Sequence, residues 1–360
     1  MNKVIIDKQD LVHNIKKIKE HSKINSPDDN GNPVKIIVVI KANAYGLDLK
    51  QYTQFMIDQG FDFFAVSTVE EALEFRNLGF KQKLLMLSST AIKEEIEELV
   101  QNDIIITIGS RESANIVNEI AKEQNKKIKA HIKIDTGFGR YGFIYSNRDE
   151  MIETIKLLDS NIQIEGTFTH FSNAFYDDKY TKLQFQRFID CIEVLKMNNI
   201  DTGILHACNS SAFVKFPQMH LNAVRIGSAF TGRLSFQNNL GLKRIAKLES
   251  QVTEIKTLPS KFNIGYSNIY KTKKETKIAI IPSGYINGIN IELGQDTFRP
   301  IDKLRTIVRA TKNAFKKQEL YVDIAEQKCK ILGRIGTFHV IADITGKDIK
   351  IGDKAKFNIN

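Results

Sequence analysis

The chain has 360 residues, 42% hydrophobic and 26% charged, a composition typical of a globular protein large enough for a barrel and a second domain. Its net charge of +10 arises from 52 basic and 42 acidic residues that are interspersed, without the arginine–aromatic pattern of a nucleic-acid platform. Three distant cysteines and the lack of an apolar run of about eighteen residues argue against a disulfide framework, a metal site and a membrane span. Because the N-terminal residues lack the features of a secretory signal, we expect a cytoplasmic protein.

Apolar segments alternate with helical periodicity through the first two thirds of the chain. The apolar segments, which predict buried strands, are 36–40, 63–67, 84–87, 104–108, 130–134, 166–169, 204–207 and 223–226. The segments that predict helices between them include 49–59, 69–78, 93–100, 111–123, 149–158 and 180–197. Eight strand–helix units in this order predict an α/β fold of the (β/α)8 TIM type.

From about Gly232 the helical periodicity fades, and short β-rich segments separated by Gly and Pro turn signals follow. We therefore predict a barrel domain over residues 8–232 and a mainly β domain over residues 233–360. The N-terminal segment 1–7 is also strand-like, and we expect it to join the second domain.

Lys41 lies where the first predicted barrel strand should end. A lysine at this position is either a solvated residue or an amine held in a pocket. The small-residue loop that follows places the hydroxyl of Tyr45 four residues further on. A desolvated lysine next to a cofactor phosphate can lose its proton and form a Schiff base, and Tyr45 can hold that phosphate.

Polar residues also end most of the other predicted barrel strands. Since the active site of such a barrel lies at the C-terminal ends of its strands, we expect these residues to converge. They are Lys41, Tyr45, Ser88, Asp135, Gly137, Arg140, His170, His206, Asn209, Ser210, Arg225 and Gly227.

Two of these strand ends match the place where barrels commonly bind phosphate, the loops after strands seven and eight. Ser210 and the backbone amides after Gly227, beginning with Ser228, can cradle a phosphate. Arg225 can face a ring nitrogen, which it cannot protonate because its own pKa is too high. Such a ring is a weak electron sink, which suits simple removal and return of a proton.

Several of these motifs, in order and over about residues 1–350, resemble those of the alanine racemases, fold-type III pyridoxal-phosphate enzymes. The segment 41–46 resembles the family's Schiff-base segment, and 133–140 resembles its fifth-strand signature. The resemblance implies that Arg140 supports the cofactor and the substrate carboxylate, and that Lys133 is a candidate for carbamylation. The other matching segments, which resemble cofactor-binding and second-domain motifs, are 169–171, 206–210, 225–227, 265–267 and 282–285.

The resemblance also implies a mechanism, a cofactor and a partner. Lys41 and Tyr266 would act as the two bases, one on each face of Cα, with Tyr266 supplied by the second subunit of a homodimer. The cofactor would be pyridoxal 5′-phosphate, bound by Lys41, Tyr45, His170, Asn209, Ser210, Arg225, Gly227 and Ser228. The reaction would be the interconversion of L- and D-alanine, as in D-alanine biosynthesis.

Three departures from the family pattern concern the entrance to the pocket. Asn287 stands where the family has an aspartate after Tyr285, and Thr337-Phe338 stands where it has Met-Asp. The last tyrosine of these 360 residues is Tyr321, so the family's further tyrosine near its C-terminus either lies in a segment beyond residue 360 or is dispensable in this member. Tyr285 and Thr337 are expected to contact substrate. Serine, or a basic amino acid such as ornithine or lysine, remains an alternative substrate.

Two other functions remain as alternatives. A non-catalytic pyridoxal-phosphate-binding protein would usually consist of the barrel alone, which the long segment after Gly232 with Tyr266 argues against. A fold-type III decarboxylase would be expected to place a carboxylate at the ring nitrogen and a glycine-rich loop at the phosphate, and Arg225 and Ser210 do not fit that pattern.

Overall fold

The computed structural model describes residues 2–24, 33–237, 239–289 and 319–358, together with Val308 and Thr311. It divides into two compact units. One unit is Lys8–Arg244, and the other combines Met1–Asp7 with Ile245–Asn360. The division falls between Arg244 and Ile245, whereas the sequence places the end of the barrel domain at residue 232.

The unit Lys8–Arg244 is built on a closed parallel barrel. Its strands are β2 (Lys35–Val39), β3 (Phe63–Val66), β4 (Lys83–Ser89), β5 (Ile105–Ile108), β6 (Ile128–Asp135), β8 (Ile162–Phe168), β9 (Ile204–His206) and β10 (Ala223–Ile226). The pairings β10–β2 and β5–β6 close the ring. A short strand, β7 (Phe143–Ile144), pairs with β6 outside it. The predicted (β/α)8 barrel is confirmed.

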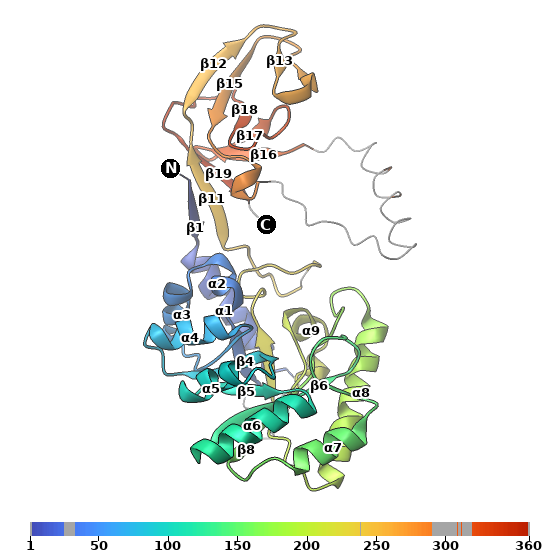
Figure 1. Cartoon of the computed structure of the whole chain (residues 1–360). Helices are drawn as coiled ribbons and strands as arrows, with labels where there is room; N and C mark the ends of the chain where they lie inside the picture. The colour runs from blue at the N-terminus through green and yellow to red at the C-terminus, as the bar shows by residue number, and fades with distance from the viewer. Residues whose placement is uncertain are drawn as a thin grey trace. The chain divides into compact units, whose positions relative to one another are not determined.

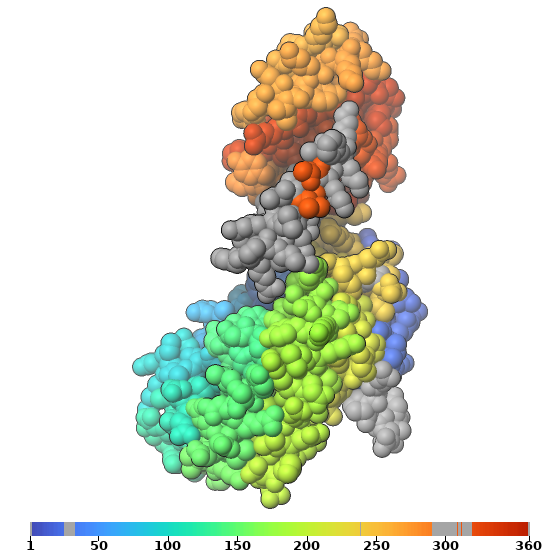
Figure 2. Space-filling view, turned by 90° about the vertical axis from the view of Figure 1, so that its right-hand side faces the viewer, coloured from blue at the N-terminus to red at the C-terminus, as the bar shows by residue number. Residues whose placement is uncertain are grey.

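Helices connect the strands on the outside of the barrel, as Figure 1 shows for α5 to α8. The helices are α1 (Lys8–His21), α3 (Leu49–Asp58), α4 (Val69–Asn77), α5 (Lys93–Gln101), α6 (Arg111–Gln124), α7 (Arg148–Lys156), α8 (Asp178–Met197) and α9 (Ser210–Lys215). Side-chain caps define where several of them begin; the hydroxyl of Ser110, for example, accepts from the amide of Ser113 at 3.1 Å. Figure 2 shows one face of this unit covered continuously by the cyan to yellow-green part of the chain.

The barrel strands are apolar on both faces because one face lines the interior and the other lies under the helices. Alternate residues of neighbouring strands form the interior cluster, which consists of Ile37, Val39, Phe63, Ala65, Leu85, Ile105 and Ala223. This burial explains why the strands could be recognised in the sequence as short apolar segments.

The second unit contains an eight-stranded antiparallel sheet in the order β1-β11-β19-β16-β17-β18-β15-β12. Its strands are β1 (Lys3–Ile6), β11 (Ala246–Gln251), β12 (Glu254–Leu258), β15 (Thr276–Ile281), β16 (Tyr321–Ile324), β17 (Gln327–Ile331), β18 (Val340–Asp343) and β19 (Lys354–Asn358). The N-terminal strand β1 pairs with β11. The prediction of a mainly β second domain is confirmed for the described residues.

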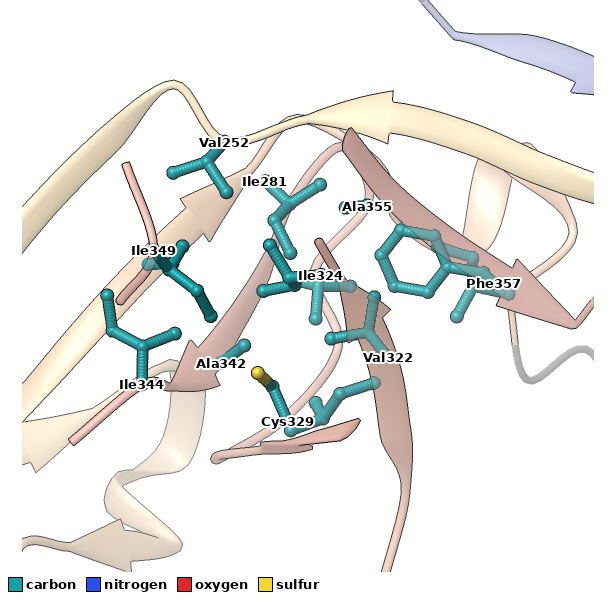
Figure 3. Close-up of a cluster of buried hydrophobic side chains, with 14 of the residues drawn as sticks. Val252, Ile281, Val322, Ile324, Cys329, Ala342, Ile344, Ile349, Ala355 and Phe357 are labelled. Carbon is teal, nitrogen blue, oxygen red and sulfur yellow. The ribbon is translucent and has the colours of Figure 1, made fainter. Parts of the chain in front are cut away.

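A separate hydrophobic core holds this sheet together (Figure 3). Side chains from six of its strands and from nearby loops contribute to the cluster, among them Val252, Ile281, Ile324, Cys329 and Phe357. All three cysteines of the chain are buried free thiols, as expected for side chains used as small apolar residues.

Candidate active site

The polar residues that end the barrel strands share one mouth, because all eight strands are parallel. His170, after β8, lies beside Arg225 and lines a small pocket with Lys133 and Arg140. Burial lowers the pKa of His170 well below its ordinary value, and the positive charges of Arg225, Lys133, Arg140 and Lys41 lower it further. The basic side chains Arg225, Arg140 and Lys41 therefore give the mouth of the barrel a positive charge suited to an anionic ligand.

Lys41 begins a left-handed turn, α2 (Lys41–Gly46), where the sequence predicts a tight loop of small residues. Ala42, Asn43, Ala44 and Tyr45 have φ values of 54°, 51°, 52° and 59°. Each such residue costs about 1–2 kcal/mol relative to a right-handed conformation, so the surrounding structure must hold the turn. Part of the support comes from the side chain of Asn43, whose oxygen accepts from the amide of Leu49 at 2.7 Å.

Tyr45, at the end of this turn, lies against Gly227. A Cβ atom added to Gly227 would lie 2.0 Å from the Tyr45 hydroxyl, so only glycine fits beside it. Burial, followed by the negative charge of Glu71, raises the pKa of Tyr45 to about 12. The hydroxyl therefore stays protonated near neutral pH and can donate a hydrogen bond.

Ser210 lies close to the same backbone. Its hydroxyl oxygen accepts from the amides of Gly227 at 3.1 Å and Ala229 at 3.3 Å, on either side of Ser228. Asn209 positions it by capping α9, accepting from the amide of Ala212 at 3.0 Å. The structure thus brings together the residues predicted to form a phosphate cradle, at the ends of the neighbouring strands β2 and β10.

Arg225 is buried on β10 and held from several sides. Its guanidinium donates to the carbonyl of Thr169 at 2.6 Å and to Nδ1 of His206 at 2.6 Å, and lies 3.4 Å from Nδ1 of His170. Its Nε atom is buried and has no hydrogen-bond partner within the described residues. Because buried N–H groups are normally satisfied, this Nε fits a ligand atom that accepts a hydrogen bond.

A buried histidine, His131, extends this network and was not identified from the sequence. Since arginine can only donate, His206 must accept at Nδ1 and carry its proton on Nε2. That proton is donated to Nδ1 of His131, 2.9 Å away. Burial, followed by the charge of Arg225, lowers the pKa of His131 to about 3, so the chain of rings is neutral. In the sequence, the only signal that could have identified His131 was a polar residue within a predicted apolar strand.

Asp135 organises the loop that carries Arg140. Its carboxylate accepts from the amides of Gly137 and Phe138 at 2.8 Å each, and from those of Gly139 and Arg140 at 2.9 and 3.0 Å. The guanidinium of Arg140 stacks over the ring of Phe138 at 4.3 Å. The predicted substrate-binding arginine is thus held at a small pocket that Lys133 and His170 also line.

Lys133 has an unusual environment for a lysine. Its Nζ donates to the carbonyl of Leu87 at 3.1 Å and lies 5.1 Å from the ring of Tyr141. Burial, followed by the charges of Arg140 and Arg225, lowers the pKa of Lys133 to about 7. A large fraction of its amine is therefore neutral near physiological pH, the form that reacts with electrophiles.

The other predicted site residues belong to the second unit. Tyr266 begins the short helix η2 (Tyr266–Asn268), and its side chain is exposed. Tyr285 begins η3 (Tyr285–Asn287), and its hydroxyl accepts from Thr337 at 2.8 Å. The structure thus brings Tyr285 and Thr337 together as a pair of hydroxyl groups.

Within the described ranges, no cluster of three or more His, Cys, Asp or Glu side chains could hold a metal ion. Each helix among these residues is too short or too polar to span a lipid bilayer. The fold and the site define a two-unit barrel protein with a lysine, a cluster of Tyr45, Ser210 and Gly227, and a buried arginine at the mouth of the barrel.

Comparison with known proteins identifies the family. The model of the alanine racemase N-terminal domain matches residues 6–235, and that of the C-terminal domain matches residues 245–358. The chain belongs to the alanine racemase family. The predictions of this family and of a racemase as the class of enzyme are confirmed.

Individual relatives agree with this assignment. An alanine racemase of Methanococcus maripaludis is 37% identical over 290 residues, which cover 79% of this chain and 75% of the relative. An alanine racemase of Clostridium tetani is 33% identical over 97% of this chain and 84% of its own length. The solved alanine racemase of Clostridium difficile 630 is 29% identical with a TM-score of 0.79, covering 100% of this chain and 87% of that one.

Proposed function

We propose that this chain is a pyridoxal-phosphate-dependent racemase that interconverts L- and D-alanine. The observation that carries the proposal is the meeting of Lys41, Tyr45, Ser210 and Arg225 at one barrel mouth, in a chain of this family. The enzyme would act in the cytoplasm and supply D-alanine to biosynthesis.

The residues present fit the cofactor. Lys41 would supply the amine that binds it, while Tyr45, Ser210 and the amide of Ser228, beside Gly227, would hold its phosphate. When bound, pyridoxal phosphate withdraws electrons from the substrate and so acidifies the proton on Cα. The unpartnered Nε of Arg225 would donate to the ring nitrogen without releasing its proton, with Asn209 and His170 as supporting residues.

Racemisation requires a proton to leave one face of Cα and return to the other, so two bases are needed. Lys41 serves one face in this proposal. Tyr266 from the partner subunit of a homodimer serves the other, and its exposed side chain is free to reach a second chain. Arg140 binds the substrate carboxylate with a charge-assisted hydrogen bond.

The substrate assignment is tested with purified protein and pyridoxal phosphate in deuterium oxide, using single L-amino acids. Deuterium exchange at Cα and the chirality of the product are both measured. We expect L-alanine to give the D-enantiomer at the highest rate. Faster turnover of serine, ornithine or lysine would change the substrate but not the reaction. Binding of the cofactor without exchange from any amino acid would instead identify a non-catalytic binding protein.

Replacing Gly227 with alanine is expected to weaken cofactor binding roughly ten- to a hundredfold, because the new methyl group displaces the Tyr45 hydroxyl. The dissociation constant is measured by absorbance titration. Y45F removes the same hydroxyl, so G227A and Y45F should weaken binding to a similar extent and combine less than additively. Unchanged affinity in G227A would contradict this account of the cradle.

Lys133 is expected to react with carbon dioxide. Its neutral amine attacks the carbon, an N–C bond forms, and one C–O π bond breaks with its electron pair moving to oxygen. The nitrogen then loses a proton to solvent, so the carbamate is negative beside Arg140. Because the pKa of Lys133 is about 7, the reactive amine should become more abundant as the pH rises through that value. With 13C-labelled bicarbonate, a carbamate NMR signal should appear and grow from pH 6 to pH 8, values chosen about one unit either side of that pKa.

The control for this prediction is Lys129, a half-buried lysine on the same strand, β6, whose Nζ pairs with the carboxylate of Asp103. K129A should keep the carbamate signal and K133A should remove it. A wild-type protein without the signal at pH 8, about one unit above the pKa, would show that Lys133 acts as a plain amine.

A further inference from the structure

We infer that Glu71 is a positioning residue for Lys41 and Tyr45: its carboxylate fixes the left-handed turn that carries both. The inference rests on the proposed function, because these two residues matter through the cofactor they are proposed to hold. Glu71 lies in the first turn of α4, outside the segments that resemble family motifs.

The carboxylate of Glu71 bridges the ends of two neighbouring strands. Oε1 accepts from the amide of Ala42, directly after Lys41, and Oε2 accepts from the amide of Ser67 at 3.0 Å. The last bond of the β2–β3 ladder runs from the amide of Ile40 to the carbonyl of Ala65 at 2.9 Å. Beyond the end of this ladder, the Glu71 carboxylate therefore accepts hydrogen bonds from the backbone that follows each of the two strands.

The turn after Lys41 depends on such contacts because four consecutive residues adopt a costly conformation. At its far end the turn is held by the oxygen of Asn43, and at its near end by Glu71 and a bond from the amide of Ala44 to the carbonyl of Ile40 at 2.9 Å. Without the carboxylate, the amide of Ala42 loses its acceptor, and the turn that carries Lys41 and Tyr45 is held less firmly at its near end.

Glu71 is itself held firmly. Its amide donates to the hydroxyl of Thr68, the N-cap of α4, at 3.3 Å. A carboxylate in the first turn of a helix is also stabilised by the helix dipole. On the strand side, the carbonyl of Ser67 accepts from the hydroxyl of Ser88 at 2.8 Å, which fixes the backbone at one of the two residues whose amides meet the carboxylate.

The experiment compares E71Q with E70Q. Glu70 is the neighbouring residue in the same helical turn, but its side chain is exposed. In E71Q the new amide nitrogen must face one of the two backbone N–H groups. Both of these groups are donors, so one of the two hydrogen bonds is lost. In E70Q the contacts to Ala42 and Ser67 remain.

In the cofactor-free protein, amide hydrogen exchange across residues 42–47 should be faster in E71Q and unchanged in E70Q. In the loaded enzyme, E71Q should bind pyridoxal phosphate more weakly and lose roughly ten- to a hundredfold in kcat/KM for alanine, while E70Q behaves as wild type. Equal thermal unfolding temperatures would show that E71Q is folded.

If E71Q matches E70Q in exchange, cofactor affinity and rate, the inference is overturned. It is also overturned if exchange increases while affinity and rate stay at wild-type values, because the turn would then not position the site. A wild-type protein that neither binds pyridoxal phosphate nor racemises alanine would instead refute the proposed function, and that result is independent of the two variants.

Discussion

Substitution of Lys41 by alanine is expected to abolish covalent attachment of pyridoxal phosphate and to lower kcat for alanine by at least about 1,000-fold. In the proposed function Lys41 both binds the cofactor and acts as one of the two bases, and a positioned base alone commonly contributes about 100- to 10,000-fold. Attachment is measured by borohydride reduction followed by mass spectrometry, and the rate by chiral analysis of the product.

The matched control is K35A, which removes an exposed lysine at the opposite end of the same strand, β2. It should retain cofactor attachment and activity. Attachment that persists in K41A at a different lysine would show that the predicted residue is not the one that binds the cofactor.

Substitution of Tyr266 by phenylalanine is expected to separate exchange from inversion. With Lys41 as the only remaining base, one enantiomer of alanine should still exchange its Cα proton with deuterium oxide. The product of the opposite configuration should form about 100- to 10,000-fold more slowly than in the wild type, since no group protonates the second face. Cofactor affinity should not change.

Y270F is the control, because Tyr270 belongs to the same unit and lies on β14 (Tyr270–Lys271), which pairs with β13 (Asn263–Ile264). It should racemise alanine at the wild-type rate. If Y266F also racemises at that rate, the second base must be another residue, and the proposed role of the partner subunit fails with it.

The barrel strands and most of the helices were predictable because their signals are local. A strand buried on both faces is a short apolar segment whatever its partners are, and the amphipathic helices between them repeat with helical periodicity. The order of these segments then limits the fold to few possibilities. The polar residues at the strand ends, such as His170 and Arg225, followed from the same reasoning, because parallel strands end at one mouth.

The contacts among those residues were not predictable, because they join segments distant in the sequence. The strained turn at Ala42 is supported by Glu71, on the helix after the next strand. The protonation of His206 is set by Arg225, and His131 enters the site only through His206. No local pattern carries such information, since each bond depends on how the strands are aligned in the closed barrel.

The sequence by itself thus determined the barrel, the β domain, the family and the identity of the candidate reactive groups. Only the tertiary structure decided the pKa values and the positions of those groups. Burial beside Arg140 and Arg225 lowers the pKa of Lys133 to about 7, and contact with Gly227 locates the hydroxyl of Tyr45. The physical reason is that residue type sets which chemistry a side chain can perform, whereas burial, charge and backbone strain are properties of the folded surroundings.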